Sequence, residues 1–195
     1  DELCIFYYLC PLSYTFVLFL QNFMNPPRQD IQQTAIEVIE KEQLAISSLR
    51  DSIDRSFLRT VEILHQSKGR LIVTGIGKSA LIGQKIVATF NSTGTPAVFM
   101  HAADAIHGDL GMIQPGDTVM CLSKSGETAE IKVLVPLIRK MGNTLIAMVG
   151  NRDSFLGRSA DYTLLASAPH EACPNDLAPT ASTTVQMVLG DALAV

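Results

Sequence analysis

Hydroxyl side chains and a glycine stand between an apolar run and a helical pattern in Ser123-Lys124-Ser125-Gly126-Glu127-Thr128. The run Thr118 to Leu122 predicts a strand, and a helix is expected from Ala129. The first N–H groups of a helix lack partners within it, and the helix dipole is positive at that end. Gly126 lets the backbone approach a ligand closely. The segment therefore predicts an anion site suited to a phosphate monoester.

A helix cap formed by Ser125 or Thr128 alone would give the same local pattern, so other segments must decide. Gly75-Ile76-Gly77-Lys78-Ser79 follows the apolar run Leu71 to Thr74, and the segment 101–111 follows a third run, 97–100. Polar turns after three predicted strands indicate one site along the carboxyl edge of a parallel sheet.

The first glycine turn resembles two nucleotide motifs and fits neither. Gly75-x-Gly77-x-x-Ala80 matches a relaxed dinucleotide fingerprint, but Met100-His101 stands where an acidic residue would bind the ribose. A phosphate-binding P-loop needs a glycine where Ile72 stands. What remains is a backbone turn with Ser79 as a donor and Lys78 as a nearby cation, so no nicotinamide cofactor is expected.

Composition indicates one globular domain without a nucleic-acid or membrane partner. The chain has 195 residues and a net charge of −4, so any phosphate must be held by local donors. The four cysteines form no C-x-x-C pair and show no zinc-like spacing: Cys4, Cys10, Cys121 and Cys173. We therefore expect reduced thiols, no metal site and a cytoplasmic protein.

The segment Leu3 to Phe23 is nearly uncharged, rich in aromatic residues and about long enough to span a bilayer. Pro11 lies in its middle, and Asp1-Glu2 stands where a signal peptide would carry positive charge. We expect residues 1–27 to form an N-terminal extension that packs on the domain or on a neighbouring subunit, with Met24 as a natural start. A membrane anchor is the alternative.

Residues 28–195 are expected to form one α/β domain with long N-terminal helices. Apolar spacing predicts a helical stretch from Gln29 to Gln66, broken near Ser47-Ser48. Five apolar strands alternate with helices after it, which predicts a three-layer, doubly wound parallel sheet flanked by helices. The expected strands are 71–74, 97–100, 118–122, 144–149 and 162–165, and the expected helices are 79–91, 104–109, 129–141, 154–158 and 180–195.

Seven segments, in order, resemble the sugar isomerase (SIS) domain of arabinose-5-phosphate isomerases. They are 73–79, 92–96, 107–112, 123–128, 171–174, 177–184 and 190–195. The resemblance covers roughly 33–195. The narrower isomerase assignment depends chiefly on His107-Gly108-Asp109-Leu110-Gly111 and on Glu171-Ala172-Cys173-Pro174.

The resemblance implies interconversion of D-arabinose 5-phosphate and D-ribulose 5-phosphate through an enediol, the entry to Kdo and lipopolysaccharide synthesis. It also implies a tetramer whose sites form between subunits, without a metal or an organic cofactor. The phosphate would be bound at Gly77, Ser79, Ser123, Lys124 (by its main chain), Ser125, Gly126 and Thr128. Lys78, His107, Glu130 and Glu171 would take the catalytic positions.

Isomerisation asks for these residue types on chemical grounds. A base must take the C2 proton, a donor or cation must stabilise the enediolate oxygen, and an acid must return a proton to C1. Positioned acid–base catalysis contributes about 10²–10⁴-fold in rate, and oxyanion stabilisation about 3 kcal/mol. Lys78 suits the oxyanion, and a glutamate suits the base if desolvation raises its pKa.

Two departures from the family pattern accompany the matches. Family members often have a shorter polar residue at the position of Lys124. They usually continue beyond Ala-Leu-Ala-Val into a Ser-His-Pro-Gly-Gly segment, and many carry paired CBS domains, whereas this chain ends at Val195. Two alternatives remain: a non-catalytic SIS sensor that binds a sugar phosphate or nucleotide-sugar, and an isomerase of another phosphosugar.

Overall fold

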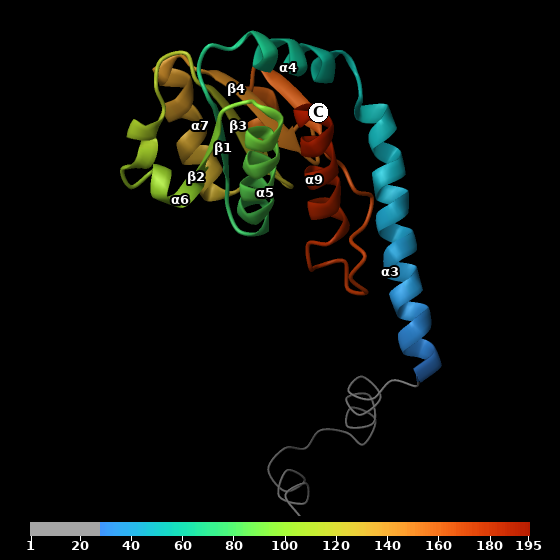
Figure 1. Cartoon of the computed structure of the whole chain (residues 1–195). Coiled ribbons are helices and arrows are strands. Elements are labelled where there is room, and N and C mark those ends of the chain that lie inside the picture. Colours follow the sequence, from blue (N-terminus) through green and yellow to red (C-terminus); the bar gives the residue numbers. More distant parts are fainter. Residues whose placement is uncertain (1–27) are drawn as a thin grey trace, which may run out of the picture. The chain divides into compact units, whose positions relative to one another are not determined.

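A five-stranded parallel sheet is the middle layer of the computed structural model, which describes residues 28–195 (Figure 1). Its strands lie in the order β2-β1-β3-β4-β5. They are β1 (Leu71–Gly75), β2 (Ala97–His101), β3 (Thr118–Ser123), β4 (Thr144–Val149) and β5 (Tyr162–Leu165). Because β1 pairs with both β2 and β3, the winding direction reverses between β1 and β3. The predicted doubly wound sheet is confirmed.

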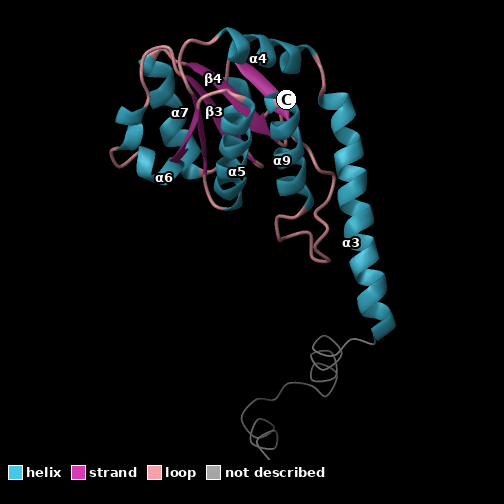
Figure 2. Cartoon of the chain, in the orientation of Figure 1, coloured by secondary structure: helices cyan, strands magenta, loops and turns pink. Residues whose placement is uncertain are grey.

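Helices cover both faces of this sheet, as Figure 2 shows in cyan around the magenta strands. One face carries α5 (Lys78–Thr93), α9 (Ala181–Ala194) and α4 (Arg55–Gln66). The other carries α6 (Ala102–Ala105), α7 (Ala129–Met141) and α8 (Phe155–Ser159). All residues of β1 and β3 are buried, as expected for strands whose two faces are both covered.

The helical stretch before the sheet breaks where the sequence predicts. Helix α3 (Arg28–Ser48) is followed by the 3-10 helix η1 (Leu49–Ser52). Asp54 then begins α4, because its carboxylate accepts hydrogen bonds from the N–H groups of Ser56 at 2.8 Å and Phe57 at 3.1 Å. The boundary between two compact units falls between Val38 and Ile39, and the second unit contains the whole sheet.

One predicted element is wrong in detail. Instead of a single short helix at 104–109, the chain forms α6 and then the 3-10 helix η2 (Asp109–Met112). Gly108 separates them with φ 141°, a backbone conformation that side-chain-bearing residues rarely adopt. The other predicted strands and helices are present, with ends that differ by at most two residues.

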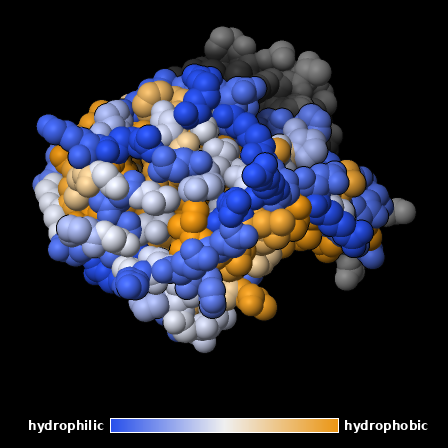
Figure 3. All heavy atoms as spheres, turned by 90° about the horizontal axis from the view of Figure 1, so that it is seen from above, coloured by the Kyte–Doolittle hydropathy of each residue, from blue (hydrophilic) through white to orange (hydrophobic). Residues whose placement is uncertain are grey.

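None of the helices formed by 28–195 has the length and apolarity that crossing a membrane requires. The predicted extension at 1–27, including the apolar segment Leu3 to Phe23, lies outside the described residues, and the domain boundary at 27/28 stays a prediction. Figure 3 views the molecule from above, where hydrophilic residues (blue) cover much of the visible face and apolar residues (orange) gather in a band across part of it.

An ion pair ties the start of β1 to the turn before β3. Asp117, which is 4% exposed, accepts hydrogen bonds from the Arg70 N–H at 2.8 Å and the Gln114 N–H at 2.9 Å. The Arg70 guanidinium also donates to this carboxylate at 2.8 Å. Burial alone raises the pKa of Asp117, but the hydrogen bonds from Arg70 and Gln114 outweigh it and lower the pKa below its usual value.

We predict that Asp117→Ala lowers the free energy of unfolding by roughly 2–5 kcal/mol, because it leaves buried N–H groups and a guanidinium without their acceptor. Glu62→Ala is the matched control, since Glu62 forms an ion pair with Arg59 at 2.6 Å with both side chains about half exposed and should cost less than about 1 kcal/mol. Urea titrations of both variants measure the difference. Equal losses would contradict the proposed role of Asp117.

Candidate functional site

A cavity of about 240 Å³ opens at the carboxyl edge of the sheet, between the ends of β1 and β3. The pairing of Gly75 with Leu122 brings the turn after β1 beside the loop after β3. The start of α9 completes the wall. The lining residues are Ile76, Lys78, Ser79, Ser123, Lys124, Ser125, Thr128, Pro179, Ser182 and Thr183.

Three helices begin at this cavity. Lys78 is the first residue of α5, Thr128 is the N-cap of α7, and Ser182 lies in the first turn of α9. Each helix therefore directs the positive end of its dipole toward the cavity. Within the described part of the chain, the lining includes two lysines and no carboxylate. The electrostatics of the cavity favour an anion.

The loop after β3 is shaped by its own serines. The buried Ser123 accepts a hydrogen bond at its Oγ from the Gly126 N–H at 3.0 Å, and Ser125 accepts one from the Glu127 N–H at 3.2 Å. Gly126 has φ 66°, and a Cβ there would lie 2.2 Å from Ser154 Oγ. Only glycine fits this position. The sequence analysis gave Gly126 the role of letting a ligand approach closely, and the structure shows that the turn itself requires a glycine.

The segment after β4 holds this loop in place. The Gly150 N–H donates to the Lys124 carbonyl at 3.0 Å, and the Leu156 N–H donates to the Gly126 carbonyl at 3.1 Å. The Phe155 N–H donates to the Glu127 carboxylate at 2.6 Å. The loop is thus preorganised by contacts with residues that do not line the cavity.

Thr128 does not cap its helix with its side chain. It is the N-cap residue of α7, yet its hydroxyl accepts no hydrogen bond from the first turn. Its Oγ1 is buried and has no hydrogen-bond partner among residues 28–195. Buried polar atoms are normally paired, so a hydroxyl without a partner in a cavity wall is suited to a hydrogen bond with a ligand. This observation favours the anion site over a simple helix cap.

Ser79 reaches from α5 to α9. Its hydroxyl donates to Gln186 Oε1 at 3.2 Å, and Gln186 is 1% exposed. The Nε2 atom of the same amide is buried and finds no hydrogen-bond partner in the described part of the chain. Sequence reasoning missed Gln186, because a glutamine in the middle of a helix carries no local sign that it contacts a site.

Glu171, expected at a catalytic position, lies behind the cavity wall and is 2% exposed. Its Oε1 accepts a hydrogen bond from Lys124 Nζ at 2.6 Å and another from the Ser182 hydroxyl. Its Oε2 accepts from the Thr180 N–H at 2.8 Å, the Ser182 N–H at 3.1 Å and the Thr180 hydroxyl at 3.2 Å. The carboxylate thus caps the start of α9.

Burial alone would raise the pKa of Glu171. The hydrogen bonds that it accepts, first from Lys124 and then from Ser182, outweigh burial and lower the pKa to about 2. The group is therefore an anion at neutral pH and accepts hydrogen bonds from the residues around it.

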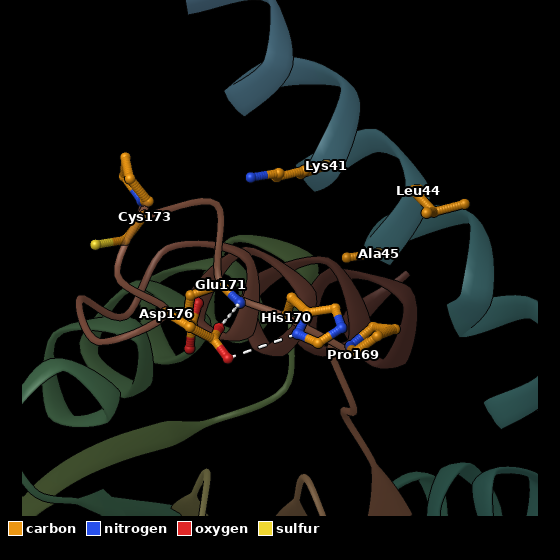
Figure 4. A pocket seen from close by; sticks show the side chains of 9 residues that line it. Lys41, Leu44, Ala45, Pro169, His170, Glu171, Cys173 and Asp176 are labelled. Carbon is orange, nitrogen blue, oxygen red and sulfur yellow. Dashed lines mark hydrogen bonds and ion pairs between the residues drawn. The ribbon is translucent and has the colours of Figure 1, made fainter. Parts of the chain in front are cut away.

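A second cavity, of about 300 Å³, adjoins the same glutamate (Figure 4). Glu171 lines it together with His170, Cys173 and Asp176 of its own loop and with Lys41 of α3. Its backbone N–H donates to Asp176 Oδ1 at 2.5 Å. Glu171 thus lines the second cavity, and its side chain accepts hydrogen bonds from residues that line the first.

The structure brings together only part of the predicted site. Lys78, Ser79, Ser123, Lys124, Ser125 and Thr128 line one cavity. Gly77, with φ 60°, is the N-cap of α5, and Gly126 shapes the loop. Glu130, half-buried in the first turn of α7, and the exposed His107, between α6 and η2, do not line it.

Sequence reasoning gave no role to Ser182 and Thr183, which do line the cavity. A signal was present, because Pro179 and Thr180 followed by further hydroxyl residues are typical of a helix start. In 28–195, no group of three His, Cys, Asp or Glu side chains is arranged to bind a metal ion.

Comparison with known proteins identifies a protein family that this chain matches. Residues 63–195 match the SIS domain. The arabinose 5-phosphate isomerase KdsD of Pseudomonas aeruginosa is 51% identical over 166 residues, which cover 85% of this chain and 51% of that protein. The same enzyme of Escherichia coli K12 is 44% identical over 169 residues, covering 87% and 52%. The chain spans about half the length of the curated relatives that it matches.

Solved structures agree with this result. A protein of E. coli CFT073 in complex with arabinose 5-phosphate superposes with a TM-score of 0.83 and is 39% identical, covering 86% of this chain and 89% of that chain.

We predict that Gly126→Ala weakens the binding of inorganic phosphate at least about tenfold, because the new Cβ collides with Ser154 and moves the loop. Gly142→Ala is the control. Gly142 also has a positive φ, 79°, but a Cβ there meets nothing within 4 Å. This variant is therefore destabilised by backbone strain alone, without a steric collision. Calorimetric titration compares the two. Unchanged binding by Gly126→Ala would contradict the loop's role.

A second prediction concerns acid stability. The folded-state pKa of Glu171, about 2, lies below the ordinary value of 4.5. Its stabilisation is therefore fully present above about pH 4.5 and is lost as the pH falls toward 2. The wild-type protein should be less stable at pH 2.5 than at pH 7, and Glu171→Gln should reduce this difference in unfolding free energy by up to about 3 kcal/mol. Urea titrations at both pH values test this, and an unchanged difference would contradict it.

Proposed function

The chain belongs to the SIS domain family, and from this premise we propose that it is an aldose–ketose isomerase interconverting D-arabinose 5-phosphate and D-ribulose 5-phosphate through an enediol. One observation carries the proposal. The N-termini of three helices and the hydroxyl of Thr128 meet in one cavity, where the residues that the structure describes supply neither a partner for this hydroxyl nor an acidic side chain in the lining. Such a site suits the dianionic phosphate end of a sugar phosphate.

The volume of the cavity supports a small ligand. At about 240 Å³ it lies just below the usual range of about 300–1,000 Å³ for drug-sized ligands. That volume suits a sugar monophosphate better than a nucleotide-sugar. Two relatives, 51% and 44% identical, are named arabinose 5-phosphate isomerases, which favours this pentose over another phosphosugar.

In the proposed mechanism, the phosphate binds the first-turn N–H groups of α7 and the hydroxyls of Ser125 and Thr128. Lys78, exposed in the first turn of α5 and on the cavity wall, stabilises the enediolate oxygen. Proton transfer between C2 and C1 is assigned to Glu130 and His107. Because His107 is exposed on the connection between α6 and η2, it suits a site completed by a neighbouring subunit.

Several properties of the whole protein belong to the proposal. They are a homotetramer with shared sites, a cytoplasmic location and a role at the entry to Kdo and lipopolysaccharide synthesis. The proposal also includes a small sugar phosphate as ligand, with no nucleic-acid or membrane partner and no metal or organic cofactor. Gel filtration with light scattering tests the assembly.

Proton NMR of the purified full-length protein with arabinose 5-phosphate in D₂O and EDTA tests the activity. The proposal predicts ribulose 5-phosphate, with deuterium entering at the carbon that exchanges its proton. Binding without conversion would favour the sensor alternative. If the protein neither binds nor converts arabinose 5-phosphate, this substrate is excluded.

Thr128→Val should weaken arabinose 5-phosphate binding by roughly tenfold to a hundredfold, the range for a lost hydrogen bond to a charged group. It should leave the melting temperature unchanged or slightly higher, since the buried hydroxyl loses no hydrogen bond to the residues that the structure describes. Thr93→Val, on the far end of α5, is the control with unchanged binding. A variant that binds normally would show that the hydroxyl does not face the ligand.

A further inference from the structure

The ion pair between Lys124 and Glu171 joins the anion cavity to the loop before α9. Lys124 lines the cavity, and its Nζ lies 2.6 Å from Glu171 Oε1. The lysine side chain is 51% exposed and the glutamate side chain 1% exposed. The ammonium of a long, exposed side chain is thus held at the cavity wall by a buried carboxylate.

Glu171 has no hydrogen-bonding capacity left for a substrate. A carboxylate offers about four lone-pair sites on its two oxygens. Five donors already occupy them: Lys124 Nζ, the Ser182 and Thr180 hydroxyls, and the Ser182 and Thr180 N–H groups. A base that takes a proton from a sugar carbon needs a free lone pair directed at that carbon.

The loop that carries Glu171 is also held from the other side. Asp176 Oδ1 accepts a hydrogen bond from the Glu171 N–H at 2.5 Å. The other carboxylate oxygen, Asp176 Oδ2, lies 3.5 Å from His170 Nδ1, and the dashed lines in Figure 4 mark both contacts. The glutamate is therefore fixed at its backbone and at its carboxylate.

We propose that Glu171 is a positioning residue that fixes the Lys124 ammonium at the wall of the anion cavity, and that this ammonium binds the ligand's phosphate. The inference rests on the proposed function, since it assigns residues to the same anion site. It gives the Lys124 side chain a role in addition to its main-chain contact, and it leaves proton transfer to other groups.

The charges explain why the two residues act together. A buried carboxylate beside an anion cavity repels a phosphate, and its paired ammonium offsets that repulsion. Removing Lys124 takes away a cation and also leaves the Glu171 charge balanced only by its hydrogen bonds from Thr180 and Ser182 at the start of α9. Removing both charges restores neutrality at this wall. The second substitution should therefore repair part of the damage done by the first.

Calorimetric titration with inorganic phosphate tests the inference without depending on turnover. The proteins compared are wild type, Lys124→Met, Lys124→Arg, the double variant Lys124→Met/Glu171→Gln, and the control Lys132→Met. Lys132 pairs with Glu127 at 2.7 Å and does not line the cavity, so its loss removes an equal charge from a neighbouring ion pair.

We expect Lys124→Met to bind phosphate about tenfold more weakly or worse, and Lys124→Arg and Lys132→Met to stay within about threefold of wild type. The double variant should bind more tightly than Lys124→Met. A purely structural role for Glu171 predicts the reverse, since a second damaging change would then weaken binding further.

Two results would overturn the inference while leaving the proposed function intact. One is that Lys124→Met binds phosphate as tightly as the control, and the other is that the double variant binds phosphate no more tightly than Lys124→Met. Wild-type protein that binds no phosphate would overturn the anion cavity and the proposed function with it. Should the double variant fail to fold, the contrast between Lys124→Met and Lys124→Arg decides, and equal affinities would overturn the inference.

Discussion

The parallel pairing of β1 with β3 is the constraint on which the site depends. It places Gly75 opposite Leu122, so the turn that begins α5 and the loop that begins α7 leave the sheet side by side. At the other edge, Asp117 ties the start of β1 to the turn before β3. Contact between α5 and α9 then brings a third helix start to the same cavity.

The electrostatics of the resulting anion site come from helix dipoles, hydroxyl groups and two lysines at its wall. This explains how a chain with a net charge of −4 provides a local site for a phosphate. Fixed N–H groups need no reorganisation when an anion binds, which favours both affinity and catalysis. The buried Glu171 is the exception, and its charge is matched by Lys124 and by the start of α9.

The sequence predicted what local signals encode. An apolar run, a glycine and hydroxyls before a helix identified Ser123 to Thr128, and the same signals identified Lys78 and Ser79. Contacts between distant segments were not predictable in this way. Ser79 and Gln186 are 107 residues apart, and Lys124 and Glu171 are 47 apart. The family resemblance pointed to Glu171, but only its partners show that the carboxylate is fully occupied.

A crystal structure of the protein soaked with arabinose 5-phosphate tests the central claim most directly. The account predicts the phosphate group in the cavity between β1 and β3, with oxygens about 3 Å from the Thr128 hydroxyl, the first N–H groups of α7 and Lys124 Nζ. A phosphate bound instead in the cavity beside His170, or no bound sugar phosphate at saturating concentration, would contradict it.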